Sequence, residues 1–183
     1  MYKKVLLILL VFHLSWPTSR SFAGYPGFVE LKSTVCVPID QQHAEKLPSP
    51  WRKYLAFTKM CPLSKTPTSK ARVFLVSVWT EDYLNAKQSN MWEEFPSSII
   101  VDDRMNNLGT LPVIFPIEAP TEPAIYFGRW KASLPTEIRV DVYDPTVSGD
   151  HYYSPLIWND KEKRFSMLDK EPKSGSRYKP QYK

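Results

Sequence analysis

The stretch that most constrains the fold is Glu137–Tyr143, in which apolar and polar residues alternate strictly. Ile138, Val140 and Val142 occupy every second position, and the positions between them carry charged or aromatic side chains. A period of two over this length is typical of a β-strand that buries one face and leaves the other in water. We therefore expect an antiparallel sheet with a solvent-facing side at this point of the chain.

The residues after this strand predict that the chain turns back on itself. Asp144–Asp150 contains proline, glycine and aspartate, whose backbone preferences favour turns. Tyr152–Trp158 and Arg164–Leu168 have strand composition, and the polar residues Asn159–Lys163 separate them. The pattern indicates a strand, a loop and a hairpin in succession.

Earlier segments add further strands. Arg72–Thr80 is apolar on both faces, which favours a central strand. Pro112 and Pro116 favour an edge position for the strand that contains them, because proline has no amide hydrogen to donate. The other segments with strand composition are Phe28–Val37, Ile99–Val101, Leu111–Ile117 and Ala124–Trp130. We predict a mainly β protein, an antiparallel β-sandwich of about seven or eight strands with one short amphipathic helix inserted after the first strand.

That helix is expected over Trp51–Cys61. Ser49 is a favourable N-cap residue, and Pro50 suits the first helical position. From Trp51 onward, aromatic and aliphatic side chains gather on one helical arc, with the basic residues outside it. Cys61 lies within this apolar arc.

Cys36 and Cys61 are the two cysteines of the chain. An even number of cysteines in an exported protein predicts a disulfide, and we expect it to join the first strand to the end of the helix. A disulfide that closes a loop of this size would stabilise the fold by about 3.5 kcal/mol in the chain-entropy model. Two buried free thiols are the alternative, and a redox pair is disfavoured because the C-x-x-C spacing is missing.

The N-terminus has the three parts of a secretory signal peptide. Lys3 and Lys4 precede the apolar run Val5–Leu14, and small residues lead to a cleavage point near Ala23–Gly24. We therefore expect a signal peptide over residues 1–23 and a mature protein in the periplasm or outside the cell. No later run is long enough for a transmembrane anchor.

The mature chain divides into one β-sandwich domain, residues 24–168, and a basic tail, residues 169–183. The tail is polar and proline-bearing, and we expect it to be disordered. The formal net charge of the whole chain is +5, but most of the excess lies in the leader and the tail. The domain between them is close to neutral, so we do not expect nucleic acid as a partner.

Sequence motifs of catalysis are missing: no G-x-S-x-G, H-E-x-x-H or phosphate-binding loop occurs, so we expect no enzyme and no cofactor. A possible oxygen-rich metal site does not match the spacing of an EF-hand, and we interpret it as a turn. Its residues are Asp141, Asp144, Asp150 and His151. The acidic pairs Glu81–Asp82, Glu93–Glu94 and Asp102–Asp103 would support glycoside hydrolysis only if folding placed two carboxylates across a cleft.

Aromatic side chains are the remaining candidates for function, because an exposed aromatic surface suits a sugar or a partner protein. The candidate binding surface consists of Trp51, Tyr54, Trp130, Tyr143, Tyr152 and Tyr153. We expect an exported, non-catalytic protein that binds an envelope protein or a small ligand. The alternatives are a protective factor against a toxin or antibiotic, a carboxylate-dependent cell-wall or glycan hydrolase, and a structural accessory of a surface assembly.

Overall fold

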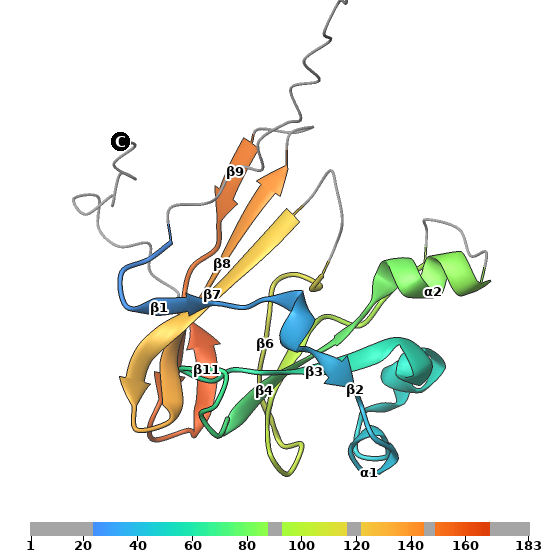
Figure 1. Ribbon diagram of the computed structural model, residues 1–183, viewed down its shortest axis with the longest axis horizontal. Helices are drawn as coiled ribbons and strands as arrows, with labels where there is room; N and C mark the ends of the chain where they lie inside the picture. The colour runs from blue at the N-terminus through green and yellow to red at the C-terminus, as the bar shows by residue number, and fades with distance from the viewer. Residues whose placement is uncertain (1–23, 88–92, 117–121, 145–148, 169–183) are drawn as a thin grey trace, which may run out of the picture.

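The computed structural model describes residues 24–87, 93–116, 122–144 and 149–168 (Figure 1). The predicted signal peptide and the predicted basic tail lie outside the described residues. Within those residues the protein is mainly β, and its strands form two antiparallel sheets of six and five strands, here called sheet A and sheet B. No helix in the described part of the chain combines the length and the apolar composition needed to cross a membrane.

Sheet A has the strand order β1-β7-β8-β10-β11. The long strands β7 and β8 form one hairpin, and the short strands β10 and β11 form another. The strand β9 also pairs with β8, and in Figure 1 the strands β7, β8 and β9 extend together toward the top of the view. The strands are β1 (Phe28–Glu30), β7 (Glu122–Lys131), β8 (Leu134–Asp144), β9 (Gly149–Tyr152), β10 (Leu156–Asn159) and β11 (Arg164–Met167).

Sheet B follows the chain in the order β2-β3-β4-β5-β6. The predicted two-faced strand is its centre, β4, and both faces are buried: Val73 and Leu75 on one side, Val76 and Val78 on the other. The strands are β2 (Val37–Pro38), β3 (Thr58–Pro62), β4 (Val73–Val78), β5 (Ile99–Asp102) and β6 (Asn107–Thr110).

The main hydrophobic core lies between the two sheets. Leu75 and Ile100 of sheet B share this core with Ile138 and Val140 of sheet A, and each side chain is at most 1% exposed. The expected inward face of the strand over Glu137–Tyr143 is therefore confirmed. The burial of apolar surface stabilises a protein by about 25 cal/mol for each Å², and it is the main stabilising contribution available to such a fold.

The two sheets contact each other at their edges, where β6 lies close to β11. A Cβ atom at Gly109 of β6 would lie 3.0 Å from the Cβ of Phe165 in β11, so this position has little room for a side chain. Phe165 is itself 2% exposed and belongs to the core between the sheets. Glycine thus permits β6 and β11 to contact each other.

A second, smaller core covers the far side of sheet B. Val78 of β4 and Ile99 of β5 contribute to it from the sheet. Trp51, Tyr54 and Tyr83 cover them, from a 3₁₀-helix and a short α-helix. The helical elements of the protein are η1 (Ser33–Val35), α1 (Gln41–Ala44), η2 (Ser49–Phe57) and α2 (Thr80–Lys87).

The predicted helix over Trp51–Cys61 is wrong in its second half and in its type. The 3₁₀-helix η2 ends at Phe57, and Thr58 begins β3. Residues Thr58–Pro62 pair with β4, so long-range hydrogen bonding overrides a helical pattern of modest strength. The hydroxyl of Thr58 also donates to the carbonyl of Tyr54 at 2.9 Å, which satisfies one acceptor at the end of the helix.

Two predicted strands also differ from the structure. The segment Phe28–Val37 is divided by η1 into β1 and β2, which lie in different sheets. The strand predicted over Leu111–Ile117 does not form in residues 111–116, which are the described part of this segment, because β6 ends at Thr110. The amide of Phe115 donates to the hydroxyls of Ser77 and Ser98, at 3.2 and 3.1 Å, so side chains replace a neighbouring strand as its partners.

The predicted disulfide is confirmed. Cys36 and Cys61 are bonded; they are 25 positions apart in sequence, with 4.1 Å between their Cα atoms. Because Cys61 lies in β3, the bond ties the segment before β2 to a strand of sheet B, where a helix end was expected.

Candidate functional site

The outer face of sheet A, which points away from the core, carries the most unusual set of polar and aromatic side chains. Ile138, Val140 and Val142 point inward, so Arg139 and Asp141 point outward. Cross-strand partners share a face. The residues opposite the outward pair are Tyr126 and Ala124 on β7 and Tyr152 on β9, and Glu30 on β1 lies opposite Tyr126.

Tyr25 lies on this outer face, although it precedes the first strand. Its hydroxyl donates to both carboxylate oxygens of Asp141, at 2.8 and 3.0 Å. Its ring packs edge-on against Tyr126, with 5.2 Å between centroids and 79° between planes, and contacts Phe28 at 5.7 Å. The guanidinium carbon of Arg139 lies 4.5 Å from the centre of the Tyr25 ring. The phenol is therefore held both around its ring and at its hydroxyl.

This packing buries a carboxylate, that of Asp141, together with phenol groups. Asp141 is 4% exposed and Tyr126 is 2% exposed. Burial raises the pKa of Tyr25 well above its ordinary value, and the negative charge of Asp141 raises it further. Burial also raises the pKa of Tyr126, with added effects from Glu30 and Asp141. Both phenols consequently stay protonated through the physiological pH range.

Arg139 is fixed by an acidic neighbour on the same strand. Its Nε atom donates to Glu137 Oε1 at 2.6 Å, and its terminal nitrogen lies 2.6 Å from the same oxygen. Arg129 on β7 lies 3.7 Å from the other oxygen of Glu137. The guanidinium of Arg139 is thereby held over the rings of Tyr25 and Phe28, an arrangement that favours cation–π attraction.

Two residues of the predicted aromatic surface lie in the second core instead. Trp51 is 3% exposed and Tyr54 is 4% exposed, so neither can present a surface to a ligand, and this expectation is corrected. The hydroxyl of Tyr54 donates to Glu93 and to the carbonyl of Glu94, the latter at 2.8 Å. The basic residues between Trp51 and Tyr54 suggested an exposed amphipathic helix, but the long aromatic side chains cover sheet B.

The other predicted aromatics are divided between core and surface. Trp130 packs against the main core beside Phe127, with 5.9 Å between ring centroids. Tyr143 is half-buried near the end of β8. Tyr152 and Tyr153 are exposed, at 56% and 40%. Of the six, Tyr152 has the most exposed side chain, and it lies on the outer face of sheet A, directly opposite Asp141.

The four predicted metal ligands do not come together as far as they are described. Asp141 pairs across the ladder with Tyr152, whereas His151 pairs with Val142, so Asp141 and His151 point to opposite faces of the sheet. The side chains of Asp144 and Asp150 lie outside the described residues. Among the described side chains, no group of three metal-binding residues is present.

The acidic pairs have separate structural roles. Glu93 forms an ion pair with Lys53, Asp82 lies 3.5 Å from Lys59, and Asp102 accepts the backbone amides of Arg104 and Asn106. One carboxylate of each pair thus has a structural partner of its own.

A shallow, open depression lies between α1 and η2. Its lining includes one carboxylate, Glu45, together with Arg52 and Leu55. Glu45 accepts a hydrogen bond from Gln41 at 3.2 Å. The arrangement differs from the paired carboxylates that glycoside hydrolysis requires.

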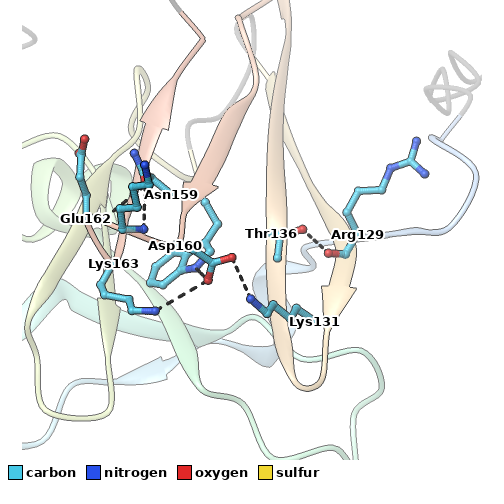
Figure 2. A network of polar contacts seen from close by, with 9 residues as sticks. Arg129, Lys131, Thr136, Asn159, Asp160, Glu162 and Lys163 are labelled. Atoms are coloured by element: carbon cyan, nitrogen blue, oxygen red, sulfur yellow. Dashed lines mark hydrogen bonds and ion pairs between the residues drawn. The ribbon is translucent and has the colours of Figure 1, made fainter.

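A polar network connects the two hairpin tips of sheet A (Figure 2). Lys131 of the β7–β8 hairpin lies 2.8 Å from Asp160 of the β10–β11 hairpin, and Trp158 donates its indole hydrogen to the same carboxylate at 3.2 Å. Lys131 and Trp158 hold the pKa of Asp160 below its ordinary value. Lys163 lies 3.8 Å from Asp160 as well, and because Lys131, Asp160 and Lys163 are all exposed, we interpret this network as a link between hairpins.

Sequence reasoning missed the central residue of the outer face. The alternation over Glu137–Tyr143 correctly placed Arg139 and Asp141 on the non-core side of the strand. Tyr25, however, precedes every expected strand, and no local pattern links it to a residue 116 positions away. A tyrosine beside Pro26 and Gly27 reads only as a turn in the sequence.

Comparison with known proteins does not assign the fold or the site: no family model, curated protein or solved structure matches this chain.

Proposed function

We propose that the protein is exported and acts by binding an envelope protein, without catalysis. The N-terminal sequence pattern supports export. The Cys36–Cys61 disulfide supports an oxidising compartment, because such bonds are rare where thiols are kept reduced. The two sheets with a common core support the inference that the domain is a β-sandwich.

The observation that carries the proposal is the exposed tyrosine on the outer face of sheet A. Tyr152 is 56% exposed and lies across the ladder from Asp141, beside the cluster of Tyr25, Tyr126 and Arg139. Tyrosine and arginine are, with tryptophan, the residue types most enriched where protein interfaces gain their binding energy. Tyrosine buries a large ring at a small cost in side-chain entropy, and arginine supplies several hydrogen-bond donors. The outer face of sheet A is thus the surface that best suits a protein partner.

A protective factor that binds a toxin, an antibiotic or its target would act in this same way, with a particular partner. The hydrolase alternative is less well supported, since one carboxylate of each acidic pair is engaged in a structural contact of its own.

The proposal is tested by capturing partners from envelope extract with the exported protein. We expect Tyr152→Ser to lose a partner that the unchanged protein retains, because the substitution removes the exposed ring and leaves the core intact. Met167→Ser is the matched control, since Met167 is also exposed, at 41%, but lies on β11. Equal capture by all three proteins would reject this face as the binding surface.

A further inference from the structure

The side chain of Tyr25 is held as a bound ligand would be. Phe28 and Tyr126 contact its ring, Arg139 lies over it, and Asp141 accepts from its hydroxyl. These four residues are here called the phenol seat. Phe28 and Tyr126 come from neighbouring strands, β1 and β7, and the two charged residues come from β8, so the seat is formed by regular sheet structure.

The backbone around Tyr25 is a small turn. The residues Gly24–Gly27, here called the N-terminal strap, precede β1, and the amide of Phe28 donates to the carbonyl of Tyr25 at 3.0 Å. Gly27 has a positive φ of 78°, which glycine adopts without strain. The hydrogen bond closes the turn within the strap and its first neighbour. The contacts of the Tyr25 side chain are therefore the main link between the strap and the outer face.

The chemistry of the seat selects an aromatic ring that carries a hydroxyl. A carboxylate that is 4% exposed favours a donor in front of it, because an ionised group out of water depends on its hydrogen bonds. The guanidinium above the ring favours an electron-rich aromatic face. A phenylalanine ring would satisfy the packing but would leave Asp141 without the phenol donor. A site of this kind discriminates against the analogue that lacks the hydroxyl.

We propose that the phenol seat binds a tyrosyl side chain of the partner protein, and that Tyr25 occupies the seat in the free protein until the partner displaces it. The inference rests on the proposed function, because it assigns a ligand to the same outer face. The seat adjoins Tyr152, which is directly opposite Asp141, so a partner that covers Tyr152 also reaches the seat. Occupation by Tyr25 reduces the fraction of molecules competent to bind and so weakens the apparent affinity.

The test uses the protein expressed from its full-length sequence and purified after export, with N-acetyl-tyrosinamide as the probe. Binding is followed by the NMR signals of the Tyr126 amide and the Arg139 side chain. We expect saturable binding to Tyr25→Ala, at least about tenfold tighter than to the unchanged protein, since the substitution vacates the seat. The phenylalanine analogue of the probe should bind at least about tenfold more weakly, because it lacks the donor for Asp141.

Two further variants keep the test decisive. Tyr153→Ala removes an exposed tyrosine outside the seat, and we expect it to bind the probe as weakly as the unchanged protein. Tyr25→Phe keeps the ring packed and removes the hydroxyl, so it remains informative even if Tyr25→Ala does not fold. We expect Tyr25→Phe to bind the probe more tightly than the unchanged protein, because the weakened occupant is easier to displace.

The inference is overturned if folded Tyr25→Ala shows no saturable binding, or if the two probes bind it equally. It is also overturned if Tyr25→Phe and the unchanged protein have the same affinity. None of these results involves the captured partner, so they leave the proposed function in place. Conversely, retained capture by Tyr152→Ser rejects the proposed function, whatever the probes show.

Discussion

The outer faces of the two sheets are covered in different ways. Sheet B is covered by η2 and α2, whose Trp51, Tyr54 and Tyr83 form a second hydrophobic core over β4 and β5. Sheet A is covered around Asp141 by one aromatic side chain, Tyr25, among charged residues. In Figure 1 the strands β7, β8 and β9 extend toward the top of the view, and α2 lies at the right.

This difference suggests that the two outer faces have separate roles, one in stability and the other in recognition. The cover of sheet B buries large aromatic rings against aliphatic strands, an arrangement that stabilises the fold through apolar area. The cover of sheet A buries a carboxylate and a phenol that satisfy each other, which contributes little net stability and requires a specific partner geometry. We infer that one outer face maintains the fold and that the other is available for binding.

The largest expected effect is on the cover of sheet B. Replacing Trp51 by Ala removes a 3% exposed side chain from the second core and should lower the free energy of unfolding by about 3–5 kcal/mol. Urea denaturation followed by circular dichroism measures this change. A loss smaller than the loss caused by Tyr25→Ala would reverse the contrast between the two faces.

A slightly smaller effect is expected from the disulfide, which acts on sheet B. Replacing both Cys36 and Cys61 by Ala should cost about 3.5 kcal/mol, because the unfolded chain regains the freedom of the loop. Hydrogen exchange should then accelerate most in β2 and β3, the strands next to the bond. Uniform acceleration across β7 and β8 as well would show that the bond stabilises the whole domain equally.

The hydroxyl of Tyr25 should contribute less. Tyr25→Phe removes the donor to both oxygens of Asp141 and should lower the free energy of unfolding by about 1–2 kcal/mol, a range consistent with the loss of a hydrogen bond to a charged group. The same denaturation assay applies, with Tyr153→Phe as the control at an exposed position. No measurable difference between the two variants would mean that Asp141 does not depend on this donor.

The smallest effect is expected from alkaline titration of the second core. Burial, together with the hydrogen bond to Glu93, raises the pKa of Tyr54 to about 12 from its ordinary 10.0. The unfolded chain thus loses its phenol proton first, so stability is complete below about pH 10 and falls as the pH rises toward 12. Tyr54→Phe should show a shallower decline over this range in pH-dependent denaturation. An unchanged slope would exclude Tyr54 as a source of the decline.

The sequence predicted strands well where one strand alone carries the signal. The alternation at Ile138, Val140 and Val142 and the two apolar faces of Arg72–Thr80 both correspond to buried positions. The prediction failed where distant parts of the chain decide the local structure. The helical pattern at Trp51–Cys61 gives way to pairing with β4, and α2 carried no helical signal strong enough to be predicted.

The candidate site follows the same rule. The strand pattern is sufficient to place Arg139 and Asp141 on the side away from the core, because it depends on neighbours two positions apart. The contact between Tyr25 and Asp141 depends on how β1 aligns with β7 and β8, a register that no local pattern specifies. For this reason the sequence placed the two charged residues on the outer face, without assigning Arg139 to a site, and missed the phenol.

The central claim, that the outer face of sheet A is the binding surface, is tested most directly by photo-cross-linking in the intact cell. A photoreactive phenylalanine derivative is introduced at Tyr152 in one protein and at Arg52, an exposed position on the cover of sheet B, in another. Because a covalent bond forms only with a neighbour in contact, we predict a cross-linked partner at position 152 and none at position 52. A partner at position 52 alone would contradict the assignment of binding to sheet A.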